Sequence, residues 1–338
     1  MAPAVHATGP RQALFDSDDI GPALPVCDHY AGVEARMRKS LQLQAQMGPV
    51  FDVTLDNEDG APVGGEVDHA HLIASLLASP DNQHGRVGVR LLPVDHPRFG
   101  DVLSTVLASP VRPAYLMLPK PHGLTDVEHA ARAVDAAGGG SVPLHALVET
   151  HGALREVFAI AAHPRIESLS FGLLDFVSAH RGAIGQSAMT ADGQFDHPLI
   201  IRAKLEIAAA CHACAKTPSH CVVTEFKDMD ALESAAERAC TLLGYTRMWS
   251  IHPDQIRPIV EAFAPRAAEV DQAIAIITAG QAAQWAPISH RHGKDTRLHD
   301  RASYRYYWQV IERAHRTSFN GGPQLPAELC QAWFGTAG

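Results

Sequence analysis

The stretch PLHALVETHGALREVFAIAAHPRIESLSFGLLDF, residues 143–176, decides the predicted fold. Two short apolar runs, 143–149 and 166–172, flank a helical segment. Both runs are apolar on both faces, which is typical of strands in a parallel sheet covered by helices. Glu149 ends the first run, and Asp175 stands three residues after the end of the second. Because burying an unpaired carboxylate costs several kcal/mol, these two acids indicate a site that supplies a partner charge.

The same alternation of strand and helix continues through most of the chain. Strands are expected at 23–27, 50–56, 86–92, 114–119, 143–149, 166–172, 220–225 and 247–252. The helical segments between them end in glycine signals, as at Gly48, Gly138 and Gly244. Eight such units over about 240 residues predict an α/β fold of the (β/α)8 TIM-barrel type rather than an open doubly wound sheet. No G-x-G-x-x-G motif follows the first strand, which also disfavours a dinucleotide-binding sheet.

Three regions are expected along the chain. Residues 1–21 form an N-terminal extension that is loosely docked, residues 22–264 form the barrel domain, and residues 265–338 form a C-terminal helical extension. This last region contains an extra helix after Pro265, an irregular stretch at 285–300, and a further helix from Arg301. A complete barrel does not need such a tail, so we expect it to pack outside the barrel or to reach a neighbouring subunit.

The bulk composition excludes several classes of protein. The 338 residues carry a net charge of −9, which argues against a nucleic-acid partner. No apolar run approaches the roughly 20 residues of a membrane helix, and the N-terminus lacks the pattern of a secretory signal. The six cysteines show no disulfide framework, so a cytoplasmic location with reduced thiols is expected. The CHAC motif at 211–214 lies in a predicted helix without a second Cys/His pair, which favours packed small residues over a zinc site.

Polar residues at the carboxyl ends of the predicted strands are the candidate functional residues, because barrel enzymes place their sites there. They are Asp56, Glu58, Asp59, Arg90, Lys120, Glu149, Asp175, Glu225, His252 and Asp254. Any one acid in this set is equally well explained as a helix cap. Two cations and several carboxylates converging on one rim are costly to assemble without a ligand. The group therefore indicates a binding or catalytic site.

Six motifs, taken together and in this order, resemble one known family. They are FDVTLDNEDGAP (51–62), RVGVRLLPVDHPRF (86–99), LMLPKPHGLTDVE (116–128), ALVETHGAL (146–154), FGLLDF (171–176) and GYTRMWSIHPDQI (244–256). The family is the HpcH/HpaI aldolase/citrate lyase family, and within it the branch similar to citrate lyase β-subunits and malyl-CoA lyases. The resemblance runs from about residue 22 to residue 315.

The resemblance implies a metal-dependent reaction. By it, Glu149 and Asp175 ligate one Mg²⁺ ion, a cation that prefers oxygen ligands and keeps coordination positions for water and substrate. Mn²⁺ fits the same ligands. Arg90 is implied to hold the oxygen that becomes negative during the reaction, since its charge cannot be lost at neutral pH.

The resemblance also assigns roles to other residues. Glu58 and Asp59 are implied to orient Arg90 or metal-bound waters, and Lys120 to contact the substrate. Asp300 falls where the family places an aspartate on a mobile segment, and there it exchanges a proton on the substrate, commonly in an adjacent subunit. A helix N-cap explains Asp300 equally well. If the tail acts between subunits, a homotrimer or a pair of trimers is expected.

The implied reaction is a reversible aldol or Claisen-type cleavage. A 3-hydroxyacyl-CoA such as malyl-CoA or citramalyl-CoA is split into a 2-oxo acid and an acyl-CoA. The chain departs from the family at strand one, which lacks the arginine and the Pro-Gly turn of thioester-using members. Two alternatives therefore stay open: a pyruvate-type aldolase acting on a free hydroxy-oxo acid, and a catalytically silent binding subunit.

Overall fold

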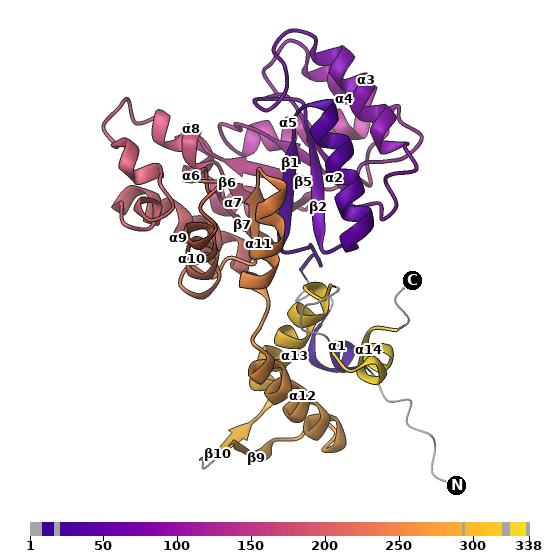
Figure 1. Cartoon of the computed structure of the whole chain (residues 1–338), viewed down its shortest axis with the longest axis vertical. Coiled ribbons are helices and arrows are strands. Elements are labelled where there is room, and N and C mark those ends of the chain that lie inside the picture. The colour runs from indigo at the N-terminus through magenta and orange to yellow at the C-terminus, as the bar shows by residue number, and fades with distance from the viewer. Residues whose placement is uncertain (1–8, 17–20, 293–294, 320–324, 336–338) are drawn as a thin grey trace. The chain divides into compact units, whose positions relative to one another are not determined.

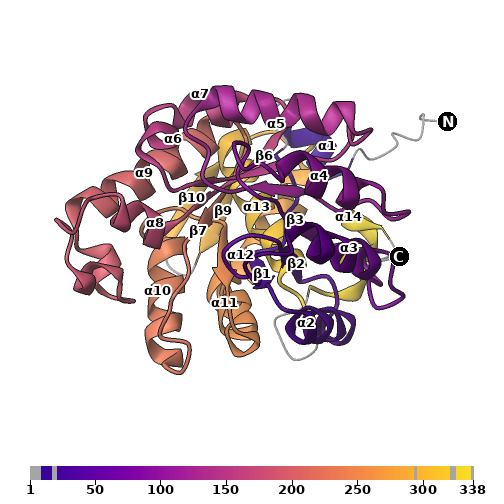
Figure 2. The ribbon, with the colours of Figure 1, turned by 90° about the horizontal axis from the view of Figure 1, so that it is seen from above.

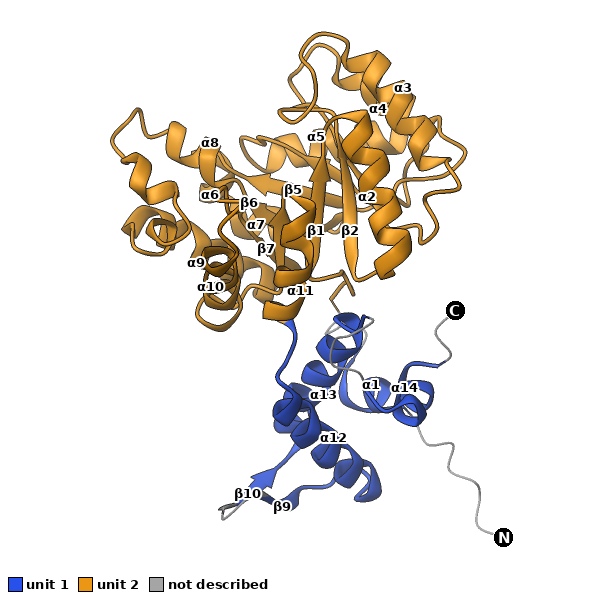
Figure 3. Cartoon of the chain, viewed as in Figure 1, with its two compact units in different colours: residues 1–20, 264–338 blue, residues 21–263 orange. Residues whose placement is uncertain are grey.

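The computed structural model describes residues 9–16, 21–292, 295–319 and 325–335. The chain forms two compact units (Figure 3). One unit is residues 21–263, and the other combines residues 1–20 with residues 264–338. Each unit has its own core and is described by itself below.

The unit of residues 21–263 is a closed barrel of eight parallel strands, as predicted (Figure 1). The strands are β1 (Cys27–Ala31), β2 (Phe51–Asp56), β3 (Val87–Arg90), β4 (Leu116–Leu118), β5 (Leu144–Val148), β6 (Ile166–Phe171), β7 (Thr217–His220) and β8 (Arg247–Ser250). Each strand pairs in parallel with the next, and β1 pairs with β8 to close the barrel.

Helices surround this barrel (Figure 2). They are α2 (Glu34–Met47), α3 (Glu66–Leu77), α4 (Phe99–Leu107), α5 (Leu124–Ala136), α6 (His151–Arg155), α7 (Val157–Ala162), α8 (Leu173–Ser178), α9 (Pro198–Ala213), α10 (Met229–Thr241) and α11 (Ile256–Phe263), with short 3-10 turns η2 (Gln186–Met189), η3 (Gly193–Phe195) and η4 (Pro253–Gln255). Their ends follow ordinary capping rules: Pro198 opens α9, and Asp228 caps α10 by accepting a hydrogen bond from Ala231 N (3.0 Å). No helix among the described residues is long and apolar enough to cross a membrane.

Two predicted strands are wrong in position. The strand expected at 23–27 is β1, which begins at the last residue of that stretch, and the strand expected at 220–225 is β7, which ends where that stretch begins. Both true strands carry polar residues that face the barrel interior. In β1 the inward residue Asp28 forms an ion pair with Arg247 of β8 (3.0 Å). A strand whose buried face is polar does not give the apolar signal on which the prediction depended.

A buried ionic network occupies the barrel interior near the amino ends of the strands. Arg247 is fully buried and contacts Asp28 and also Asp52, whose Oδ2 lies 2.6 Å from its guanidinium. Arg86 completes the network with a two-pronged contact to Asp52 (2.7 and 2.9 Å). Two acids are thus matched by two cations, which is the condition under which buried charges are tolerated.

A small apolar cluster follows this network toward the carboxyl ends of the strands. Its members are Tyr30, Met117, Leu147, Val222 and Trp249, all at most 8% exposed. The cluster separates the ionic network from the rim that carries the predicted site residues.

The second unit is helical with one hairpin. It contains α1 (Pro10–Leu14), α12 (Ala267–Ala282), β9 (Ile288–His292), β10 (Asp295–His299), α13 (Arg301–Arg316) and α14 (Ala327–Phe334). The stretch expected to be irregular, 285–300, contains the antiparallel β9–β10 hairpin. Its strands are rich in histidine and arginine, so they lack the apolar pattern that predicts a strand. Residues 10–14 are not loosely docked either, because Leu14 is fully buried against Tyr304 and Trp308.

Candidate functional site

Seven of the ten predicted site residues come together at the carboxyl ends of β2 to β6. Asp56 and Arg90 are the last residues of β2 and β3, and the others lie on the loops or helix starts that follow β2, β4, β5 and β6. Contacts of 2.5–3.7 Å connect these residues into one polar group. Its members are Asp56, Glu58, Asp59, Arg90, Lys120, Glu149 and Asp175. We call this group the rim cluster.

Arg90 is fixed by Asp56. Arg90 Nε donates to Asp56 Oδ1 (2.7 Å) and its NH2 donates to Oδ2 (2.5 Å), while NH1 lies 3.2 Å from Glu58 Oε2. Burial works to lower the pKa of Arg90, but Asp56 and Glu58 outweigh it and raise the pKa above its ordinary value. The guanidinium therefore keeps both its charge and its orientation.

Asp56 is the rim residue whose role the sequence did not reveal. The β2–β3 register places it directly beside Arg90. The loop after β2 wraps around its carboxylate, because Glu58 N donates to Oδ1 (2.9 Å) and Gly60 N donates to Oδ2 (2.8 Å). A Cβ at Gly60 would lie 2.2 Å from Asp56 Oδ2, so only glycine permits this approach. The available signal was its position as the last residue of a strand that pairs with β3.

Lys120 connects the acids that follow β2 with Asp175, which follows β6. Its Nζ donates to Glu58 Oε1 (2.5 Å) and Asp59 Oδ2 (2.7 Å) and lies 3.7 Å from Asp175 Oδ1. Partial burial works to lower the pKa of Lys120, but the hydrogen bonds to Asp59 and Glu58 raise it above its ordinary value. The side chain is therefore charged at neutral pH.

The backbone of Lys120 is also unusual. Its φ is +50°, a left-handed conformation that side-chain-bearing residues rarely adopt. In this conformation Lys120 N donates a 2.8 Å hydrogen bond to Glu149 Oε1. Strain of this kind persists only where the surrounding structure holds it, and it concentrates at functional sites.

Glu149 is almost fully buried at the end of β5, with 4% of its surface exposed. Burial, and secondarily the nearby negative charge of Asp175, raise its pKa to about 8. Gly172, at the end of β6, allows the chain to pass close by, because a Cβ there would lie 2.1 Å from Glu149 Oε2. The Glu149 side chain is therefore closely packed. No ion pair with another described residue balances the charge of its carboxylate form.

The donor set fits a divalent metal ion. Asp56 is matched by Arg90, and Glu58, Asp59 and Asp175 all share Lys120, so three acids compete for one ammonium group and Glu149 has no ion-pair partner among the described residues. A hard cation with two positive charges balances two carboxylates through the oxygen ligands that Mg²⁺ prefers. Within the described part of the chain, no three His, Cys, Asp or Glu side chains form a complete metal cage. Two carboxylates suit an ion that takes its other ligands from water and substrate.

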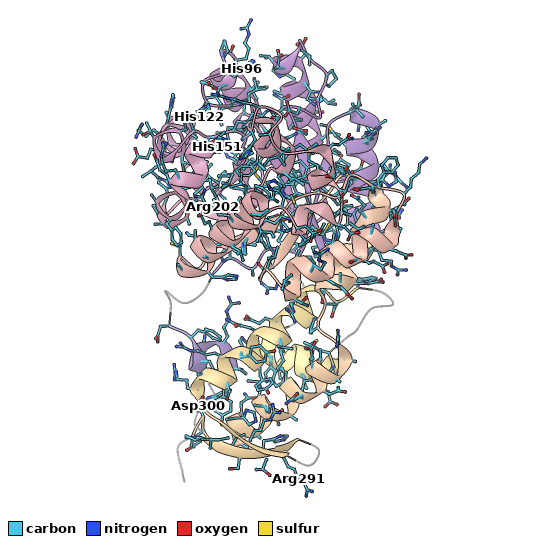
Figure 4. All side chains as sticks on the ribbon, turned by 90° about the vertical axis from the view of Figure 1, so that its left-hand side faces the viewer. His96, His122, His151, Arg202, Arg291 and Asp300 are labelled. Carbon is cyan, nitrogen blue, oxygen red and sulfur yellow. The ribbon has the colours of Figure 1, made fainter. Side chains whose placement is uncertain are left out.

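Asp300 belongs to the other compact unit, where it begins α13 (Figure 4). Its Oδ1 accepts hydrogen bonds from Ala302 N (3.1 Å) and Ser303 N (3.2 Å), and Ser303 Oγ accepts one from Asp300 N (2.9 Å). This is a helix N-cap, one of the two roles weighed from the sequence. The proton-transfer role stays a prediction.

The remaining polar residues of the rim have structural partners. His252 Nδ1 accepts a hydrogen bond from Asp254 N (3.3 Å), and the imidazole stacks on Phe226 with 5.2 Å between ring centroids. Glu225 accepts a hydrogen bond from Ala191 N (2.9 Å), which ties the loop of residues 180–197 to the end of β7. These side chains order the loops after β7 and β8.

Comparison with known proteins gives sequence relatives at modest identity. No family model matches the chain. An L-malyl-CoA/β-methylmalyl-CoA lyase of Cereibacter sphaeroides is 27% identical over 248 residues, which cover 69% of this chain and 77% of the relative. A (3S)-malyl-CoA thioesterase from the same species is 28% identical over 200 residues, covering 59% of this chain and 60% of the relative.

Solved structures extend the comparison over almost the whole chain. CitE of Mycobacterium tuberculosis, crystallised with magnesium, acetoacetate and coenzyme A, is 20% identical with a TM-score of 0.65, and covers 86% of this chain and 98% of that one. This likeness shows the shared fold. A citrate lyase of Burkholderia xenovorans is 51% identical with a TM-score of 0.80, and covers 97% of this chain and 99% of that one. The protein therefore belongs to the citrate lyase β-subunit-like family of carbon–carbon lyases.

Proposed function

We propose that the protein is a Mg²⁺-dependent lyase that cleaves a 3-hydroxyacyl-CoA, such as malyl-CoA or citramalyl-CoA, into a 2-oxo acid and an acyl-CoA. The observation that carries this proposal is the pair Glu149 and Asp175: Glu149 is buried close to the negative charge of Asp175, and the cation nearest Asp175, Lys120 at 3.7 Å, is shared with Glu58 and Asp59. The names of the relatives agree with it, since they include malyl-CoA lyases and a CitE crystallised with magnesium and coenzyme A.

In this proposal Glu149 and Asp175 hold the metal. When bound, Mg²⁺ supplies Lewis-acid polarisation of the carbonyl group of a 2-oxo acid. Mn²⁺ has the same ligand preference and serves as a substitute. The backbone N–H of Lys120 keeps Glu149 Oε1 in place through its 2.8 Å hydrogen bond.

Arg90 stabilises the oxygen on which negative charge develops. A guanidinium has five N–H donors, and Asp56 accepts two of them here, while Glu58 forms an ion pair with NH1. Three N–H groups, one on NH2 and two on NH1, are available to a substrate oxygen. Because Asp56 fixes the guanidinium before the substrate arrives, no reorganisation is needed as the charge develops.

Lys120 and its acid partners complete the site. Glu58 and Asp59 hold the ammonium group of Lys120 beside Asp175. From this position Lys120 contacts the carboxylate of the substrate, and Glu58 and Asp59 orient Arg90 and water molecules.

Asp300 is the proposed proton carrier, and it acts on the site of an adjacent subunit. A positioned acid of this kind contributes roughly 10²–10⁴ in rate. With this arrangement we expect a homotrimer or a pair of trimers, in which one chain's tail covers its neighbour's barrel. The N-cap contacts of Asp300 use one carboxylate oxygen, Oδ1, and its Oδ2 makes neither of the two cap hydrogen bonds.

One observation favours a second candidate, an aldolase acting on a free hydroxy-oxo acid. Strand β1 reads CDHYA and offers no arginine or lysine to a coenzyme A phosphate, and its five residues are all buried. The test is a panel of 3-hydroxyacyl-CoA thioesters and free hydroxy-oxo acids, assayed for Mg²⁺-dependent release of a 2-oxo acid. Turnover of thioesters alone supports the first proposal, turnover of free acids alone replaces it with the second, and turnover of neither refutes both.

A substrate-independent measurement accompanies this panel. Mg²⁺ together with oxalate, a mimic of a 2-oxo acid enolate, should raise the melting temperature more than either alone, because a ligand that binds only the folded state stabilises it. The Glu149→Gln variant should lose this response.

A further inference from the structure

One ring of an aromatic pair lies against the guanidinium of Arg90. Tyr30 of β1 and Trp249 of β8 stack with ring centroids 4.5 Å apart and an interplanar angle of 24°. The guanidinium carbon of Arg90 lies over the Tyr30 ring, 5.4 Å from its centroid. Because β1 and β8 are neighbours in the barrel wall, the stacked rings occupy the lumen directly below the rim cluster.

The pair packs within an apolar cluster that lies between the charged groups of the ionic network and those of the rim cluster. Tyr30 and Trp249 belong to the buried cluster that also contains Met117, Leu147 and Val222. A cation over an aromatic face is held more strongly when both are withdrawn from water, because the attraction is less screened. Arg90 is itself 8% exposed, so the contact meets this condition.

The Tyr30 hydroxyl has no hydrogen-bond partner among the residues that the structure describes. Burial raises the pKa of Tyr30 well above its ordinary value, so the phenol is neutral. Leaving a buried hydroxyl unpaired carries a cost rather than a benefit. The aromatic ring, and not the hydroxyl, is therefore the part of Tyr30 that serves Arg90.

We propose that Tyr30 is a positioning residue for the lyase reaction, and that its ring fixes the Arg90 guanidinium from the barrel interior. Asp56 holds the guanidinium edge through two hydrogen bonds, which fix its plane only along that edge. The Tyr30 ring supports the face, and Trp249 supports the ring in turn. The contacts thus act on two different sides of the guanidinium, its edge and its face. Strand β1 thus contributes an aromatic ring to the site.

This inference rests on the proposed role of Arg90 and is tested with two variants. Tyr30→Phe keeps the ring and removes the unpaired hydroxyl, so it should retain kcat within about twofold and keep or increase stability. Tyr30→Leu keeps the cluster apolar and removes the ring, so it should lower kcat by about three- to thirtyfold. KM and the Mg²⁺ affinity, measured by calorimetry, should stay within about twofold in both variants.

The Arg90→Lys background shows whether Tyr30 acts through Arg90. Tyr30→Leu should have little further effect on kcat in that background, because the group that it positions is already gone. Equal losses in Tyr30→Phe and Tyr30→Leu, wild-type kcat in Tyr30→Leu, or an undiminished loss in the Arg90→Lys background would each overturn the proposal.

A double-mutant cycle measured by unfolding tests the Tyr30–Arg90 contact independently of the proposed function. Urea unfolding of wild type, Tyr30→Leu, Arg90→Met and the double variant measures the coupling of the two side chains without any substrate. Non-additive unfolding midpoints support the contact even if no substrate is turned over, whereas additive midpoints refute it even if the enzyme is an active lyase.

Discussion

Metal binding should release a proton from Glu149. In the metal-free protein its pKa is about 8, because burial and Asp175 disfavour the charged form. A metal ion binds the carboxylate and not the acid, so its apparent affinity should fall as the pH falls below 8. Between pH 8 and pH 6 the ionised fraction falls from one half to about one hundredth. The apparent association constant for Mg²⁺ should therefore fall about 50-fold, or about 2.3 kcal/mol.

Titration calorimetry in two buffers of different ionisation enthalpy measures both quantities. At pH 6.5 we expect about one proton released for each Mg²⁺ bound. The Glu149→Gln variant should bind weakly at every pH and release no proton from this position. Glu206→Gln is a matched control, since Glu206 pairs with Arg202 on the surface of α9 (2.8 Å) and should change neither result. Affinity that is independent of pH, without proton release, would refute the assignment of Glu149 as a ligand.

The same pKa fixes the sign of a stability effect. The pKa of Glu149 is raised above its ordinary value of 4.5 in the folded protein. Its protonated form therefore stabilises the metal-free fold at low pH, and this contribution is lost as the pH rises through about 8. Since Mg²⁺ offsets the buried charge, the increase in melting temperature on adding Mg²⁺ should grow between pH 6 and pH 8.5. An increase that shrinks over this range would contradict the linkage.

Three further variants test other parts of the molecule. Arg90→Lys should lose most of the turnover while keeping its charge, because an ammonium cannot reproduce the two-pronged contact to Asp56; near-normal turnover would exclude the stabilising role. Asp300→Ala should lower kcat by about 10²-fold or more if it carries a proton, and mixing it with Glu149→Gln chains should restore activity only if the tail acts between subunits; a loss of about 1 kcal/mol of stability alone would indicate a helix cap. Leu14→Ala should destabilise the unit that contains α13 by about 2–5 kcal/mol in chemical unfolding, and a wild-type transition would refute the packing of α1.

The sequence determined the architecture of the barrel and the members of its rim. Repeated apolar runs separated by amphipathic helices predicted eight strand–helix units, because strand and helix periods can be distinguished over short windows. The carboxyl ends of parallel strands must meet at one edge, so polar residues at strand ends were predicted to converge. Arg90, Lys120 and Glu149 were identified in this way, and the structure brings them together.

Only the tertiary structure decided which side chains pair with one another. The pairing of Asp56 with Arg90 depends on the register between β2 and β3, and the raised pKa of Glu149 depends on burial and on Asp175, far along the chain. The position of β1 was missed because Asp28 is buried as the partner of Arg247, so the polarity of the strand signalled a pairing and not exposure. Local patterns report the average environment of a residue, whereas partners 26 to more than 200 residues apart are brought together only by the closed barrel.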